Sequence, residues 1–136
     1  MNGNDSNNCQ TPETTCKTIG HAISLAASGD SIILAAATYA ENLIIGLSLN
    51  VIGSGASTTI IDGGGKGTVV SVSDAVANVT LSQLTIQNSS PSGIYNLGSL
   101  EITNSTVRNN GTTSFIGVVL AIASVPVSAM AVYSSS

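Results

Sequence analysis

The amino-acid sequence predicts an all-β fold in which the chain coils as a parallel β-solenoid, preceded by one short helix. The first observation is a repeat, since residues 79–89 superimpose on residues 100–110 at an offset of 21 residues. A repeat of this length is too short for a β-α-β unit but fits one coil of a solenoid. The second is a series of short β-branched segments separated by glycine-rich breakers. Both are typical of strands that stack coil on coil, joined at tight corners.

The amino-acid composition excludes some classes of partner for this chain. The 136 residues correspond to one domain, with three cationic residues, seven acidic residues and a formal net charge of −4. Three scattered cations cannot neutralise a run of phosphates, so neither nucleic acid nor an anionic membrane surface is an expected partner. The many Ser, Thr, Asn and Gly residues indicate an extracellular or cell-surface protein. Met1 is followed directly by polar residues, so no signal peptide is expected here.

Residues 1–28 are expected to form an N-terminal flap and a capping helix. The flap contains the only two cysteines, Cys9 and Cys16, which are seven positions apart. They could be a reduced, partly buried pair, but an extracellular composition favours a disulfide. With two thiols and no histidine beside them in the sequence, a zinc site is not expected.

A helix is predicted after the flap because apolar residues recur at helical spacing on one face: Ile19, Ala22, Ile23 and Ala26. Thr15 or Thr18 can serve as its N-cap, and Gly29 is expected to end it. A short one-sided helix at this position would cover the apolar end of the first coil. His21 lies opposite the apolar stripe, so we expect it to be exposed and solvated.

Residues 29–114 are expected to form the coils. The predicted strands are residues 31–39, 43–45, 47–52, 58–61 and 68–72, followed by the two copies of the repeat. Within the first copy, a corner at Ser82–Gln83 would return Leu84 and Ile86 to the interior. In the second copy, Ser105 is a weaker occupant of the position of Leu84.

The repeat also predicts a ladder of side chains at one corner. Asn88 and Asn109 occupy equivalent positions, so they would stack one coil apart, at about 4.8 Å. Stacked amides at a turn can hydrogen-bond to one another and to the backbone along the solenoid axis. The pair is therefore predicted to be structural.

Several segments resemble a known family. They are residues 3–9, 16–23, 28–34, 38–39 and 52–63, with residues 93–98 and 102–107 further on. These segments resemble right-handed parallel β-helix proteins of the pectate-lyase-like superfamily, especially secreted bacterial repeat proteins and the repeats of polymorphic outer-membrane proteins. The resemblance covers roughly residues 3–110 and implies a right-handed coil. It does not specify a function, because the superfamily includes lyases, hydrolases, adhesins and structural fibres.

The resemblance carries no catalytic residue over to this chain. Catalytic members of the superfamily group acidic calcium ligands and a basic residue on one strand face. Here Asp62 and Asp74 are isolated in the sequence, and Arg108 has no acidic neighbour at coil spacing. We therefore expect no catalytic, metal-binding or cofactor-binding residues.

Residues 115–136 form an apolar C-terminal segment with no charged residue. Three interpretations remain open, in order of preference: further coils of irregular register, an edge for self-association, and a membrane anchor. For further coils, Phe115 would align with Ile94 and Val118 with Leu97. An anchor is disfavoured by Pro126 and the absence of flanking cations. The association edge would comprise Phe115, Val118, Val119, Leu120 and Ile122.

These observations favour a non-enzymatic extracellular module with a structural, adhesive or self-assembling role. The alternative is a polysaccharide-active enzyme of the lyase or hydrolase type, or a fragment of one. Self-association through the C-terminal end is the expected partnership. Carbohydrate is a candidate ligand because outward-facing hydroxyls and two tyrosines could contact a sugar: Thr80, Thr85, Thr103, Thr106, Tyr39 and Tyr95.

Overall fold

A computed structural model describes residues 3–10, 15–116, 118–123 and 131–133, with side chains described as far as Arg108 except at residues 90–92. One helix, α1 (Ile19–Leu25), precedes the strands. These are β1 (Asp30–Ile33), β2 (Ala37–Ala40), β3 (Leu43–Ile45), β4 (Leu49–Ile52), β5 (Thr59–Asp62), β6 (Val70–Val72), β7 (Asn78–Ser82), β8 (Thr85–Asn96), β9 (Ser99–Thr103), β10 (Thr106–Ile116), β11 (Val118–Ala123) and β12 (Ala131–Tyr133).

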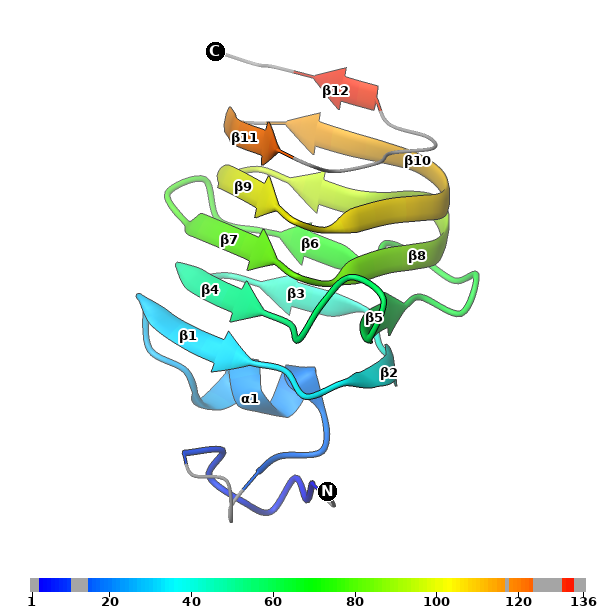
Figure 1. The fold of residues 1–136 in the computed structure, drawn as a ribbon. Helices are drawn as coiled ribbons and strands as arrows, with labels where there is room; N and C mark the ends of the chain where they lie inside the picture. Colours follow the sequence, from blue (N-terminus) through cyan, green and yellow to red (C-terminus); the bar gives the residue numbers. More distant parts are fainter. Residues whose placement is uncertain (1–2, 11–14, 117, 124–130, 134–136) are drawn as a thin grey trace.

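The strands form a right-handed parallel β-helix, as predicted (Figure 1). One sheet has the order β1-β4-β7-β9-β11, and the second has the path β12-β10-β8-β5-β2, with β3 and β6 joined to it. Every recorded strand pair is parallel and links a strand to its equivalent in the next coil. The apolar residues that face inward form one continuous core along the axis.

The 21-residue repeat has the predicted register. Val79 pairs with Leu100 and Leu81 with Ile102 across β7 and β9. Across β8 and β10, Ile86 pairs with Val107. All six side chains are buried. The repeat therefore places like residues on top of one another in the core, which is the packing expected of a solenoid.

The corner of the repeat also lies where the sequence predicts it. Gln83 has a φ of 57° and the equivalent Asn104 a φ of 49°, and these left-handed residues turn the chain between strands. Leu84 and Ser105 follow them and are buried. The preceding coil passes close by, because a Cβ on Gly53 would lie 2.1 Å from the backbone oxygen of Gln83. Glycine is required at position 53 by this close approach rather than by its φ angle.

The coils differ in length. Asp30 pairs with Leu49, whereas Leu49 pairs with Val79, 30 residues further along the chain. The second coil is longer because of the segments before β5 and between β5 and β6. The single strand predicted at residues 31–39 is wrong, because the chain turns a corner after β1 and continues as β2. The hydroxyl of Tyr39 donates a hydrogen bond to the backbone oxygen of Ala35 in this corner, at 2.9 Å.

Helix α1 covers the end of the first coil, with Ile19 buried in the core (Figure 1). Its N-cap is Thr18, whose hydroxyl accepts a hydrogen bond from the backbone N–H of His21 at 3.2 Å. The carboxylate of Glu41 accepts the N–H groups of Ile19 and Gly20, each at 2.9 Å, which satisfies two free donors of the first turn. The predicted end at Gly29 is wrong, because the helix ends at Leu25 and Ala26 is already extended.

The apolar C-terminal segment continues the coil wherever its backbone is described. β11 pairs with β9, and β12 pairs with β10. The predicted register is wrong here, because Phe115 pairs with Asn96 and Val118 with Ser99, after irregularities in β10 between residues 110 and 114. The side chains of the predicted association edge lie outside the described residues, so that edge stays a prediction. Among the residues that can be described, no helix is long and apolar enough to cross a membrane.

Candidate functional site

Three polar side chains line up on the outer surface of consecutive coils. Asp62 on β5 pairs in register with Gln87 on β8, and Gln87 pairs with Arg108 on β10. They point outward because the preceding residue of each strand points into the core. Those preceding residues, Ile61, Ile86 and Val107, are buried. We call Asp62, Gln87 and Arg108 the polar row.

Hydrogen bonds connect the polar row from end to end. The side-chain amide of Gln87 donates through Nε2 to Oδ2 of Asp62 at 2.9 Å. Its Oε1 accepts a hydrogen bond from Nε of Arg108 at 3.0 Å. The neighbour of Arg108 one coil back is the neutral Gln87, and Asp62 lies two coils away. Gln87 links these two charged residues through its side-chain amide. These two hydrogen bonds orient the three side chains relative to one another.

The carboxylate of Asp62 is the anchor of the polar row. Besides Gln87, its Oδ1 accepts hydrogen bonds from the backbone N–H of Gly64 at 2.8 Å and from Nδ2 of Asn88 at 3.0 Å. The bond from Gln87, followed by those from Gly64 and Asn88, holds the pKa of Asp62 below its usual value despite some desolvation. Asp62 is thus an ionised carboxylate, and its donors make it a weak base.

Arg108 forms the exposed end of the polar row. Among the residues whose side chains are described, Arg108 makes one hydrogen bond, from its Nε to Gln87. A guanidinium carries five N–H donors in a planar fork, so the Nη groups remain able to meet an oxygen-rich ligand. Asp62 and Gln87 are half-buried, which leaves their outer faces accessible to solvent.

The predicted asparagine ladder is described only at its first member. Asn88 has a φ of 63° and directs its side-chain amide back to Asp62 of the preceding coil. The side chain of Asn109 lies outside the described residues, so stacking of the two amides stays a prediction. What the structure adds is that Asn88 supports the polar row.

The predicted array of outward hydroxyls is wrong at Thr85. That side chain is buried and its hydroxyl donates to the backbone oxygen of Ala56, because the segment before β5 covers it. Thr80, Thr103 and Thr106 are half-exposed. A continuous flat hydroxyl surface is therefore interrupted on the same strand that carries Gln87.

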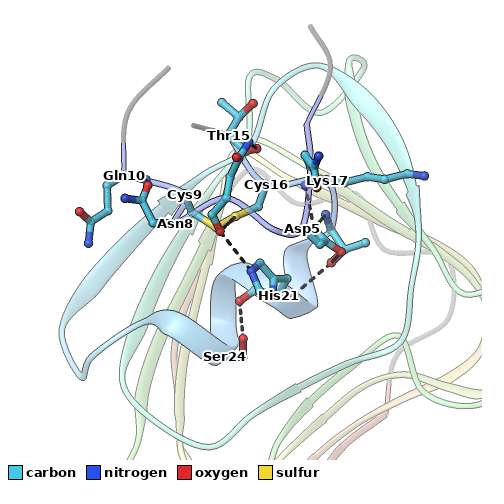
Figure 2. The surroundings of a disulfide bond; sticks show 12 residues. Asp5, Asn8, Cys9, Gln10, Thr15, Cys16, Lys17, His21 and Ser24 are labelled. Atoms are coloured by element: carbon cyan, nitrogen blue, oxygen red, sulfur yellow. Dashed lines mark hydrogen bonds between the residues drawn. A yellow bond between two sulfur atoms is a disulfide. The ribbon is translucent and has the colours of Figure 1, made fainter. Parts of the chain in front are cut away.

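The N-terminal flap contains a second group of reactive side chains. Cys9 and Cys16 are joined by a disulfide. The expectation of a solvated His21 is wrong, because Nε2 of its ring lies 3.2 Å from the backbone oxygen of Asn7, beside the disulfide (Figure 2). Cys9, Cys16 and His21 place their ligand atoms within 4.8 Å of one another. His21 follows Cys16 by five residues in the sequence, and the fold places its ring beside both cysteines.

The flap also borders a groove of about 1090 Å³. Its walls are the flap, one side of α1 and the strands β1 and β2. Both cysteines, Ile33 and Tyr39 line this groove, whereas the residues of the polar row do not. Tyr39 is half-buried there, and desolvation raises its pKa. The polar row and the groove are therefore two distinct features.

Comparison with known proteins supports the fold. No protein-family model and no curated protein matches the sequence. Among solved structures, the chain is similar to a mutant pectin methylesterase in complex with a hexasaccharide, with a TM-score of 0.59 and 15% sequence identity. The match covers 87% of this chain and 47% of the pectin methylesterase, so the chain spans about half of that structure. At this identity the likeness shows the fold alone, which is a parallel β-helix.

Proposed function

We propose that this chain is an extracellular, non-enzymatic module that binds a polysaccharide through the polar row. The observation that carries the proposal is the hydrogen-bonded alignment of Asp62, Gln87 and Arg108 across three coils. Three adjacent strands span about 10 Å, so the row can contact an extended ligand at more than one point. A shallow, preorganised polar surface suits a chain of sugars better than a small, enclosed molecule.

The chemistry of the row matches the groups of an acidic sugar. Asp62 offers a charged acceptor for hydroxyl groups, and Gln87 offers an amide that both donates and accepts. The guanidinium of Arg108 can hold a carboxylate through two parallel hydrogen bonds. We therefore expect acidic polysaccharides to bind more tightly than neutral ones.

Two features favour binding over catalysis. Asp62 is kept ionised by three donors, which weakens it as a base or nucleophile. Hydrolysis of a glycosidic bond usually needs two carboxyl groups, and within the polar row Asp62 is the one carboxylate. A polysaccharide-active enzyme remains the second candidate, because the similar solved structure is a pectin methylesterase.

The test is affinity electrophoresis and calorimetry with a panel of neutral and acidic polysaccharides. Arg108→Gln should weaken binding of an acidic polysaccharide about tenfold or more, since a hydrogen bond to a charged group is lost. Lys17→Gln is the matched control, because it removes the same charge from the exposed flap. Equal affinities of the two variants, or no binding by the wild type, would contradict the proposal. Turnover that disappears in Asp62→Asn would replace it with the enzymatic candidate.

We also propose self-association through the C-terminal end. Within the described residues, β11 is the last strand of the five-stranded sheet and pairs with β9 on one side. The outer backbone of a last strand can pair with a second chain. Light scattering should show a mass that rises with concentration, and Ala121→Lys should reduce it by adding a charge to that strand. A wild type that is monomeric at all concentrations would remove this proposal.

A further inference from the structure

The group formed by Cys9, Cys16 and His21 has the composition of a metal site. Two sulfurs and an imidazole are a ligand set that zinc favours, with water completing a four-coordinate site. All three residues are partly buried, and the two cysteines line the groove beside the flap, which provides a path for an ion. While the sulfurs are joined in a disulfide, neither is available as a thiolate.

We propose that reduction of the Cys9–Cys16 disulfide converts this group into a zinc-binding site, so that the flap exchanges a covalent crosslink for a metal crosslink. The ligands are Sγ of Cys9, Sγ of Cys16 and a ring nitrogen of His21. In Figure 2 the imidazole of His21 rises from α1 towards the disulfide. The contact of its Nε2 with Asn7 keeps the ring on the side of the two sulfurs.

The flap is held in place by hydrogen bonds that do not depend on the disulfide. Asp5 accepts the backbone N–H groups of Lys17 and Thr18, each at 2.8 Å, and the hydroxyl of Thr18 at 2.7 Å. The side-chain amide of Asn7 donates to the backbone oxygen of Thr15 at 2.7 Å. Because these bonds flank both cysteines, the thiols remain near His21 after the S–S bond is broken.

The chemical steps balance with a dithiol reductant. The dithiol supplies two electrons and two protons, becomes a disulfide itself, and leaves Cys9 and Cys16 as free thiols. Zinc then displaces the two thiol protons as it binds. Two thiolates on a tetrahedral zinc lie about 3.7 Å apart, given Zn–S bonds of about 2.3 Å. The Cα atoms are 5.0 Å apart, so rotation of the side chains can separate the sulfurs to this extent.

The experiment uses the full chain, reduced with a phosphine in place of the dithiol so that no added thiol binds the metal. The phosphine takes an oxygen atom from water to become a phosphine oxide, the two protons of that water go to the thiols, and the reagent is then removed under an oxygen-free atmosphere. Co²⁺ is added as a coloured substitute for Zn²⁺, and the thiolate-to-cobalt absorption is recorded before Zn²⁺ is titrated in to displace it. We expect one ion per reduced chain and no such absorption with the oxidised chain. His21→Ala should weaken cobalt binding by at least about 10–100-fold. Mutating a residue that only orients a metal ligand costs this much affinity, and removing the ligand itself costs no less.

Ser24→Ala is the matched control, because it changes the same helix one turn further on without removing a ligand. It should bind cobalt as the wild type does. His21→Gln replaces His21→Ala if circular dichroism shows that the alanine variant is unfolded. The proposal is overturned if the reduced chain shows no thiolate-to-cobalt absorption, if both His21 variants bind as tightly as the wild type, or if the oxidised chain binds equally well.

Discussion

Two rows of side chains run across the same three strands and differ by a single residue in position. The inward row is Ile61, Ile86 and Val107, and the outward row is Asp62, Gln87 and Arg108. Both follow the same backbone register from β5 to β8 to β10. The inward row is buried, whereas the outward row ends in an exposed guanidinium.

The difference shows how a β-helix separates the side chains that stabilise its core from those that reach its surface. Side chains alternate between faces along a strand, so one step along the chain exchanges the core for the surface. On the inward face, burial of apolar side chains stabilises the fold in proportion to the area buried, and this effect does not depend on the orientation of the contacting groups. Outward, hydrogen bonds compete with water and contribute little net stability, but they fix the direction in which polar groups point. The outer row can therefore change while the coil is retained.

The largest expected effect distinguishes the two rows directly. Ile86→Ala should lower the free energy of unfolding by about 2–5 kcal/mol, because it leaves a cavity in a fully buried position. Gln87→Ala, one residue further on, should lower it by less than about 1 kcal/mol. Urea unfolding of both variants measures the difference. Similar losses would show that the outer row also supports the fold.

A smaller loss of stability is expected at Ser105, an inward-facing position that is occupied by a polar residue. Ser105 is buried, donates to the backbone oxygen of Thr103 at 2.9 Å and accepts from the N–H of Leu84 at 3.4 Å. Ser105→Ala should lower the free energy of unfolding by about 1 kcal/mol in the same urea assay. The control is Ser82→Ala, at a half-exposed position. A stabilised Ser105→Ala would mean that burial of the methyl group outweighs the lost hydrogen bonds.

The smallest effect concerns the pH dependence of the outward row. The pKa of Asp62 in the folded chain is below its ordinary value of 3.8, chiefly because of the bond from Gln87. Its contribution to stability is therefore present above the ordinary pKa and is lost as the pH falls through the lower, folded value. Between about pH 5 and about pH 2, the wild type should lose more stability than Asp62→Asn. Unfolding curves that run parallel over this range would show that the carboxylate does not stabilise the fold.

The repeat and its corner could be predicted from the sequence, but the polar row could not. Regular spacing aligns Val79 with Leu100 because the two copies have equal length. Counting the same 21 residues back from Gln87 reaches Lys66, whereas the strand register places Asp62 opposite Gln87. The extra residues of the second coil shift the strand register away from a 21-residue spacing. The partner of Gln87 therefore becomes known only from the strand pairing in the structure.

His21 and the helix end were missed for a related reason. A helical wheel places His21 on the exposed side, because it considers α1 alone. The flap returns to cover that side, held by Asp5, which is 13 residues from Thr18 in the sequence. Likewise, Gly29 would end a helix in isolation, but its N–H donates to the backbone oxygen of Ser48 in the next coil. Contacts between distant segments overrode the local signals in each case.

The unequal lengths of the coils suggest how such a molecule can be modified. The segment between β5 and β6 contains Gly64, Gly65 and Gly67, all with positive φ, and none of their positions is crowded by backbone. Doubling the length of a flexible loop costs only about 0.6 kcal/mol of closure entropy. This loop starts directly after Asp62 and lies beside the polar row. A longer insertion there could add specificity for a new ligand while the stacked core beneath it stays unchanged.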